Sequence, residues 1–160
     1  MKIPAPFAEY ECDVLPEWID YNGHINVGFY LLPFGQAAKP FFNWLDLSAR
    51  YRKESACSLF VAEAHLTFER EVTGGDKLRF ETYLLGFRAK VINAIHLMYH
   101  ADGGYLAATN EVVYIHVDSQ SKNSQPMSDG HLRFLADVAQ AHATLPRPRQ
   151  AGRAINVVTQ

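Results

Sequence analysis

The chain has 160 residues, 48% of them hydrophobic, which is enough to bury one continuous core. Its 15 Lys and Arg residues face 17 Asp and Glu residues, and the net charge of -2 disfavours a polyanionic partner such as nucleic acid. No stretch reaches the ~20 apolar residues of a membrane span, and the residues after Met1 lack the apolar core of a signal peptide. We therefore expect a cytoplasmic protein with no membrane or nucleic-acid partner.

The first predicted elements are a short strand and a long helix. Glu9 to Leu15 mixes polar and apolar residues and stops at Pro16, which is typical of a strand that leads into a turn. From Val27 to Leu45 apolar residues occur on nearly every face, and this pattern indicates a helix enclosed by the fold. Because an interior proline removes a backbone hydrogen bond and costs about 3 kcal/mol, we expect a kink or a break near Pro40.

Four strands and a final helix are predicted in the rest of the chain. The segment 77–88 alternates apolar and polar residues, and glycine pairs at 74–75 and 103–104 mark two of the turns. The four predicted strands are Leu59 to Val72, Lys77 to Arg88, Val91 to His100 and Tyr105 to Val117. Ser128 or Asp129 is a good N-cap for the last helix. We expect one domain over residues 1–145, followed by a basic, proline-containing tail, 146–160, whose order the pattern leaves open.

One strand, one apolar helix and four consecutive strands predict an α+β fold. In such a fold an antiparallel sheet must curl around the single helix to bury it. The sheet then has two exposed edges, and edges of long strands pair readily with a second copy of the chain. We therefore expect a homodimer, or a dimer of dimers.

The turn before the long helix carries the residues best suited to chemistry. Residues 20–26, Asp-Tyr-Asn-Gly-His-Ile-Asn, place a carboxylate, an imidazole and two amides ahead of an apolar segment. The structural interpretation of Asp20 is that it caps the turn or stabilises the helix dipole. The functional interpretation is that Asp20 attacks a carbonyl, or deprotonates a water that does so, while the first N–H groups of the helix stabilise the oxyanion. Gly23 permits close approach of the backbone.

Four other polar residues have both structural and functional interpretations. His24 is either a packed histidine or a catalytic group that orients water, and Asn26 is either the helix N-cap or a ligand of the substrate. Glu63 and His65 alternate to the same face of their predicted strand, so a carboxylate and an imidazole lie side by side. The structural interpretation of that pair is a solvated strand face.

Neither a metal nor a cofactor is expected. His96 and His100 have the spacing of a helical zinc site, but on a strand they lie roughly 13 Å apart, too far to share one ion. The sequence also lacks a Gly-x-Ser-x-Gly elbow, a phosphate-binding glycine loop and a dinucleotide fingerprint. The common serine hydrolase, nucleotide-binding and NAD-dependent classes are therefore disfavoured.

The run from Pro16 to Asn26, with Tyr30 four residues on, resembles the opening of the hotdog-fold acyl-CoA thioesterases of the 4-hydroxybenzoyl-CoA type. This resemblance implies a hotdog fold with active sites at a dimer interface. It places Asp20 on the catalytic carboxylate and Gly23 and His24 beside the thioester carbonyl. Asn26 and Tyr30 then lie where the helix begins.

A closer likeness is to the thioesterases that accompany carnitine dehydrogenase, whose substrate is betainyl-CoA. It is carried by the run from Trp18 to Asn26, by Glu63-Ala64-His65 and by the segment 107–111, Ala-Ala-Thr-Asn-Glu. The likeness implies an acyl-CoA substrate, with Trp18, Gly23, Tyr30, Glu63 and His65 as substrate-binding residues. Glu63 would then face the trimethylammonium group.

We therefore expect a thioesterase without metal or cofactor, in which Asp20 is the nucleophile or general base and His24 and Asn26 assist. Two alternatives stay open. One is a hotdog hydratase or dehydratase that uses Glu63 and His65 as its acid/base pair. The other is a non-catalytic acyl-CoA binding protein in which Asp20 only caps the turn.

Overall fold

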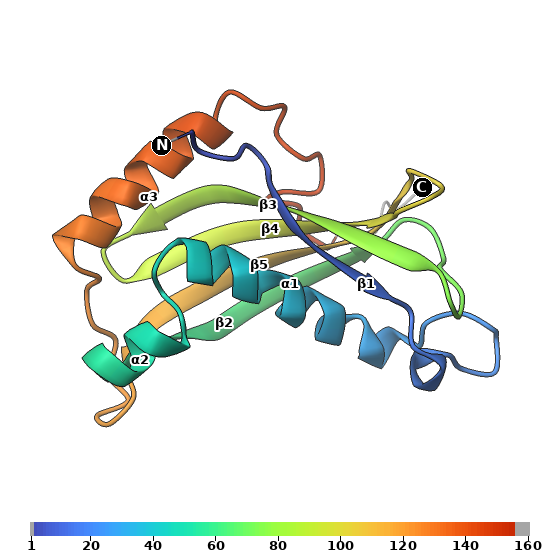
Figure 1. Cartoon of the computed structure of the whole chain (residues 1–160), viewed down its shortest axis with the longest axis horizontal. Helices are drawn as coiled ribbons and strands as arrows, with labels where there is room; N and C mark the ends of the chain where they lie inside the picture. The colour runs from blue at the N-terminus through green and yellow to red at the C-terminus, as the bar shows by residue number, and fades with distance from the viewer. Residues whose placement is uncertain (1, 156–160) are drawn as a thin grey trace.

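The computed structural model describes residues 2–155 and shows one antiparallel sheet of five strands, in the order β1-β3-β4-β5-β2 (Figure 1). The strands are β1 (Phe7–Asp13), β2 (Cys57–Phe68), β3 (Lys77–Arg88), β4 (Val91–His100) and β5 (Leu106–Asp118). Antiparallel pairing joins each neighbouring pair of strands, and β2 and β1 form the two edges. The predicted α+β class is confirmed.

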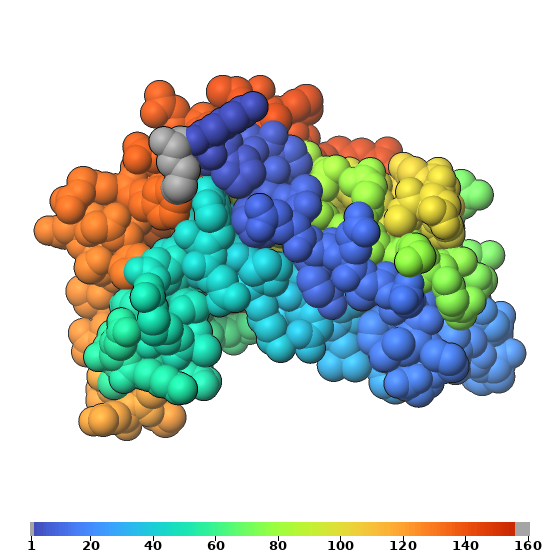
Figure 2. Space-filling model, viewed as in Figure 1, coloured from blue at the N-terminus to red at the C-terminus, as the bar shows by residue number. Residues whose placement is uncertain are grey.

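Three helices accompany the sheet. They are α1 (Leu31–Trp44), α2 (Ala49–Ser55) and α3 (Asp129–His142), with short 3₁₀ turns at Pro16–Trp18 and Val27–Phe29. The helix α1 crosses the front of the sheet, while α3 packs against the C-terminal part of β3 (Figure 1). In the space-filling view the surface of α1 is visible along this front face, and β1 lies above it (Figure 2). No helix in residues 2–155 is long and apolar enough to cross a membrane.

The core lies between α1 and the alternating inward-facing residues of the sheet. On β3 the buried residues are Leu78, Phe80, Thr82 and Leu84, every second position of the strand. Strand alternation puts such residues on one face, and here that face packs against α1. The sheet therefore curls around a helix that contributes its own buried residues, Pro33, Phe34, Ala37, Ala38 and Phe41.

The long helix differs from its prediction in where it begins, and the break considered near Pro40 does not occur. It begins at Leu31 and not at Val27, because Asn26 caps a separate 3₁₀ turn by accepting a hydrogen bond from the Gly28 N–H at 2.9 Å. It also continues through Pro40 without a break. Burial of the flanking Phe41 holds the helix together against the missing backbone hydrogen bond.

The predicted strands β3 and β4 are confirmed, and the other bounds differ slightly. The second strand ends at Phe68, so 69–72 belong to the connection. The polar stretch before it folds into α2, because the Ser48 hydroxyl caps that helix by accepting from the Arg50 N–H at 3.2 Å. For the final helix the cap is Ser128, whose hydroxyl accepts from the His131 N–H at 3.3 Å.

The described part of the C-terminal segment, 146–155, is bound to the sheet by polar contacts. Arg149 forms an ion pair with Glu69 at 3.0 Å, and the Gly152 N–H donates to the Glu111 carboxylate at 2.6 Å. This segment passes behind the sheet, on the face opposite α1 (Figure 1). The rest of the predicted tail, 156–160, lies outside the described residues.

Candidate active site

The turn that carries Asp20 is fixed by backbone hydrogen bonds on both sides. The Asp20 N–H donates to the His24 carbonyl at 3.1 Å, and the Gly23 N–H donates to the Asp20 carbonyl at 3.0 Å. Gly23 adopts a φ of 84°, a conformation that favours glycine. The Ile25 N–H donates to the Val72 carbonyl at 3.2 Å, which ties the turn to the chain that follows β2.

Only one of the two carboxylate oxygens of Asp20 accepts a hydrogen bond within residues 2–155. Its Oδ1 accepts from the Asn22 N–H at 2.8 Å, an Asx turn that sets the side-chain direction. Its Oδ2 has no hydrogen-bond partner within residues 2–155. The predicted capping role and a reactive role are therefore compatible, because each uses a different oxygen of the same group.

Asp20 lines a cavity of about 540 Å³ between the turn, the start of α1 and the end of β2. The other lining residues are Tyr21, His24, Ile25, Asn26, Val27, Tyr30, Phe68, Glu69, Arg70 and Glu71. All three residues predicted to be catalytic, Asp20, His24 and Asn26, thus meet at one cavity, together with Tyr30. Gly23 shapes the turn without lining the cavity.

Tyr30 gives this cavity an aromatic wall with a hydroxyl. Its ring packs edge-on against Phe68, with centroids 4.9 Å apart. Burial raises the pKa of the Tyr30 phenol above its ordinary value, with a smaller contribution from the charge of Glu71. Tyr30 therefore keeps its proton at neutral pH and can donate a hydrogen bond.

The backbone donors beside Asp20 differ from those expected. The Gly28 N–H is taken by the Asn26 side chain, and the Phe29 N–H donates to the Asn26 carbonyl at 2.9 Å. Within the described chain the Val27 N–H has no acceptor, and Val27 lines the cavity. The expected row of free donors from a helix beginning at Val27 is wrong, because the 3₁₀ turn uses two of them.

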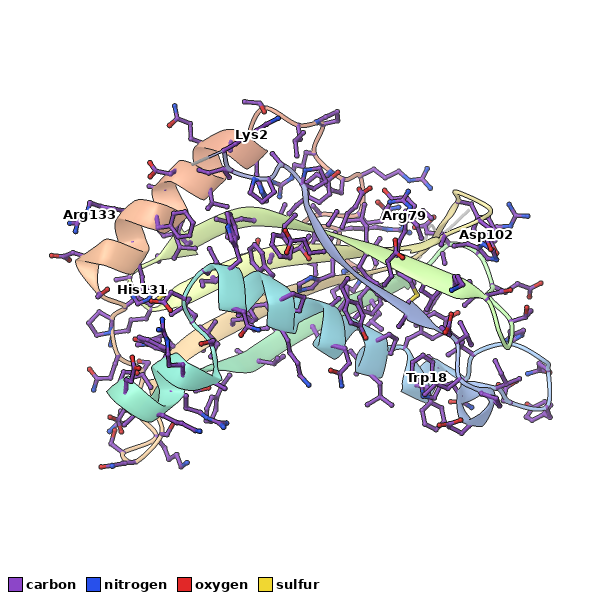
Figure 3. All side chains as sticks on the ribbon, viewed as in Figure 1. Lys2, Trp18, Arg79, Asp102, His131 and Arg133 are labelled. Carbon is purple, nitrogen blue, oxygen red and sulfur yellow. The ribbon has the colours of Figure 1, made fainter. Side chains whose placement is uncertain are left out.

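Trp18 packs in the core and is joined to the turn by a backbone hydrogen bond. It is 9% exposed and belongs to the core, and its carbonyl accepts from the Asn26 N–H at 2.9 Å. Its side chain lies near the end of β1, next to the turn (Figure 3). The cavity lining does not include Trp18.

The far wall of the cavity consists of residues that sequence reasoning missed. Glu69 accepts from Gln150 at 2.8 Å and from Arg149 at 3.0 Å, and the Gln150 bond is the main cause that lowers the pKa of this carboxyl. The Arg70 guanidinium lies 4.1 Å from the centroid of the Tyr105 ring. No local spacing signals this wall, because it forms only when the end of β2 meets the Asp20 turn.

Glu63 and His65 do lie side by side, as predicted, and line one cavity of about 510 Å³ with Glu111. Ala64, between them on the strand, faces the opposite side and lies beside α1. The pair is therefore on the other face of the sheet from α1 and does not reach the Asp20 cavity of the same chain.

An antiparallel sheet wrapped around one helix, with a carboxylate on the turn before that helix, defines a hotdog-fold protein of the thioesterase class. The chain belongs to the thioesterase-like superfamily, whose family model matches residues 14–144. The predicted resemblance is confirmed, and the protein is a thioester hydrolase.

Two relatives carry the same activity in their names. A betainyl-CoA thioesterase of Pseudomonas aeruginosa is 37% identical over 148 residues, which cover 92% of this chain and 93% of that protein. An L-carnitine dehydrogenase/betainyl-CoA thioesterase of Agrobacterium fabrum is 33% identical over 153 residues, which cover 96% of this chain but 31% of that longer protein. The predicted likeness to carnitine-associated thioesterases is therefore confirmed.

Solved structures agree with the fold. A putative thioesterase from Pseudomonas putida KT2440 is 28% identical, has a TM-score of 0.81 and is matched over 98% of this chain and 99% of its own. A Staphylococcus aureus protein in complex with CoA has a TM-score of 0.86 at 24% identity, over 99% of this chain and 100% of its own. At 24% identity, the likeness to the Staphylococcus aureus protein supports the fold alone.

Proposed function

We propose that the protein hydrolyses an acyl-CoA thioester to a free acid and CoA at the cavity that Asp20 lines. The observation that carries this proposal is that Asp20 and Val27 line the same cavity, while within residues 2–155 the Asp20 Oδ2 accepts no hydrogen bond and the Val27 N–H has no acceptor. A carboxylate oxygen beside a backbone donor is the pair that acyl transfer needs: one group attacks or activates water, and the other stabilises the oxyanion.

In this mechanism the thioester carbonyl oxygen points toward the Val27 N–H. Asp20 Oδ2 either attacks the carbonyl carbon, forming an anhydride that water then cleaves, or removes a proton from a water that attacks instead. Collapse of the tetrahedral intermediate breaks the carbon–sulfur bond, and the CoA thiolate takes up a proton, which comes from the protonated Asp20 in the general-base route and from the water that cleaves the anhydride in the nucleophilic route. His24 and Asn26 orient the water or the carbonyl, and the protonated Tyr30 offers a further hydrogen bond.

The acyl group is proposed to be small, with betainyl as the first candidate. Support comes from the two relatives, whose names include betainyl-CoA thioesterase activity and whose matches span most of this chain. Glu63 and His65 stay proposed substrate-binding residues. Because both lie on the face of the sheet away from α1, they would meet the substrate only across an interface with a second copy.

We further propose a homodimer, or a dimer of dimers, in the cytoplasm. The support is the edge strand β2, which pairs with β5 alone and exposes apolar side chains such as Val61. An unpaired strand edge of this length is a ready surface for a second copy.

The test is release of CoA thiol from a panel of acyl-CoAs by the wild type and by Asp20→Asn. This change removes the charge and keeps the Asx turn, because the amide oxygen still accepts from the Asn22 N–H. We expect turnover to fall about 10²- to 10⁴-fold, the range of lost acid–base catalysis. The control is Asp137→Asn on the exposed face of α3, which should leave turnover unchanged.

Unchanged turnover in Asp20→Asn would remove this carboxylate from the mechanism. If the wild type binds acyl-CoA but releases no thiol from any of them, the non-catalytic binding protein is the correct interpretation. Addition of water to an enoyl-CoA without thiol release would instead support the hydratase.

A further inference from the structure

A third cavity, of about 360 Å³, runs between α1, β2 and β5. We call it the α1 groove. Its lining is largely apolar and consists of Leu31, Phe34, Gly35, Ala38, Lys39, Phe42, Val61, Ala64, Asn110, Val112 and Tyr114. Both cavities lie along α1 and β2: Tyr30, the N-cap of α1, and Phe68, the last residue of β2, line the Asp20 cavity, while Leu31 and Val61 line the groove. An acyl group whose carbonyl lies at Asp20 can therefore extend along these two elements toward the groove.

Asn110 is the one residue in the groove lining whose buried polar atom lacks a partner. The residue is 5% exposed, and its Oδ1 has no hydrogen-bond partner among residues 2–155. Buried amide oxygens are almost always paired, so an orphan in a cavity wall calls for an explanation. The torsion of the terminal amide is soft, so the oxygen can turn toward a group in the groove.

Tyr114, four residues along the same strand, differs from Asn110 because its buried polar atom has a hydrogen-bond partner. Its hydroxyl is hydrogen-bonded to Nε2 of His96 at 2.9 Å, so it needs no ligand. Its ring meets Phe42 edge-on, with centroids 4.7 Å apart. The groove thus combines aromatic rings with a single unpaired amide.

This combination suits a quaternary ammonium better than an alkyl group. Aromatic faces attract such cations without a carboxylate, and the positive methyl groups are attracted to a carbonyl oxygen. Lys39 is the one charged side chain that residues 2–155 contribute to the lining; it is exposed, and its Nζ donates to Gln36 Oε1 at 2.7 Å. A neutral alkyl group would leave the Asn110 oxygen unpaired.

We propose that the α1 groove is the acyl pocket and that Asn110 determines its specificity, selecting an acyl group with a quaternary ammonium over a neutral group of the same shape. This inference rests on the proposed thioesterase function. Asn110 acts in binding and takes no part in the attack on the carbonyl.

The test compares two acyl-CoAs of matched shape, betainyl-CoA and 3,3-dimethylbutyryl-CoA, which differ in a quaternary nitrogen against a quaternary carbon. We expect the wild type to have the higher kcat/KM for betainyl-CoA. Asn110→Leu should lower the ratio of the two kcat/KM values about tenfold, the effect of one unpaired buried polar group. Asn110→Asp keeps an oxygen acceptor in the same shape and should retain the preference.

The control is Ile115→Leu, on the opposite face of the same strand, which should leave the ratio unchanged. If wild type and Asn110→Leu hydrolyse both substrates with the same ratio, the inference is overturned while the proposed function stands. If the wild type hydrolyses neither these nor any other acyl-CoA, the proposed function itself fails. A ratio that falls equally in Asn110→Asp and Asn110→Leu would show that packing, and not the acceptor oxygen, sets the preference.

Discussion

At the scale of single residues, Asn26 links local structure to the site. Its Oδ1 accepts from the Gly28 N–H and its carbonyl accepts from the Phe29 N–H, so it builds the 3₁₀ turn that presents Val27 to the cavity. The two interpretations of this residue, a cap and a part of the site, therefore coincide. By capping the 3₁₀ turn, the Asn26 side chain holds the backbone N–H of Val27 in position.

Replacing Asn26 with Ala is expected to lower the free energy of unfolding by about 1 kcal/mol, the typical value of an N-cap. It should also reduce kcat/KM, because the Val27 N–H is then less well positioned. Asn26→Ser keeps a capping oxygen and serves as the matched control. Urea denaturation and steady-state kinetics measure the two effects, and an Ala variant as stable as the wild type would rule out the capping role.

At the scale of secondary structure, a buried chain of hydrogen bonds joins the three central strands. Thr82 on β3 is bonded to His96 Nδ1 on β4 at 2.8 Å, and His96 Nε2 is bonded to Tyr114 on β5 at 2.9 Å. His96 is fully buried, and desolvation lowers its pKa to about 4. The imidazole is therefore neutral, and it fixes the Tyr114 ring that lines the α1 groove.

This buried histidine makes stability depend on pH. An unfolded chain takes up a proton at His96 below its ordinary pKa of about 6.5, whereas the folded chain resists protonation down to about 4. The contribution of the neutral, buried His96 to the free energy of unfolding is therefore complete above about pH 6.5 and is lost as the pH falls toward 4. From His96 alone we expect the free energy of unfolding to be about 2 kcal/mol lower at pH 5 than at pH 7.5.

Urea denaturation at a series of pH values between 7.5 and 5 measures this slope, and His96→Gln should make it shallower. Burial also lowers the pKa of His142, which adds a slope of the same sign that the variant retains. The carboxyl of Glu69, whose pKa is lowered, contributes mainly below this window. Equal slopes in the wild type and in His96→Gln would contradict the assigned burial effect.

At the scale of the whole molecule, the two edges of the sheet are not equivalent. The edge strand β2 exposes Phe60, Val61 and Phe68 at 43%, 62% and 50%. Apolar side chains on an unpaired strand favour self-association. The same edge borders the Asp20 cavity through Phe68 and the α1 groove through Val61, so a second copy there would enclose both.

We expect sedimentation analysis to show a dimer or tetramer for the wild type and a smaller species for Val61→Lys, because a buried charge opposes strand pairing. Ala136→Lys, on the exposed side of α3, adds the same charge elsewhere and should leave the assembly unchanged. A monomeric wild type with full activity would refute the proposed dimer.

Much of the fold is predictable because its signals are local. The start of β3 and the end of β4 follow from the glycine-containing turns at 73–76 and 101–104, β3 alternates along its length, and the Ser128 cap marks the start of α3. The helix α2 escaped prediction because its segment is polar and lacks apolar periodicity. It is held instead by a distant contact, in which the Tyr51 hydroxyl meets Nε2 of His116 at 2.9 Å.

The site also has one part that the sequence predicts and another part that it does not. Asp20, His24, Asn26 and Tyr30 lie within eleven residues, so a turn and the helix that follows necessarily keep them close. Glu69 lies far from them in sequence and reaches the cavity only because it follows the end of β2, and Gln150, which donates a hydrogen bond to Glu69, comes from the C-terminal segment. Spacing along the chain carries no signal for such a meeting.

The sequence by itself determined the order of the strands, the long helix and the final helix, the carboxylate-bearing turn and the likeness to thioesterases, because alternation, turn chemistry and motif spacing are properties of neighbouring residues. The tertiary structure alone decided which faces meet. It put Glu63 and His65 on the side of the sheet away from α1, and it put the unpaired oxygen of Asn110 beside that helix. Those outcomes depend on strand pairing and burial across the whole chain, which no local pattern encodes.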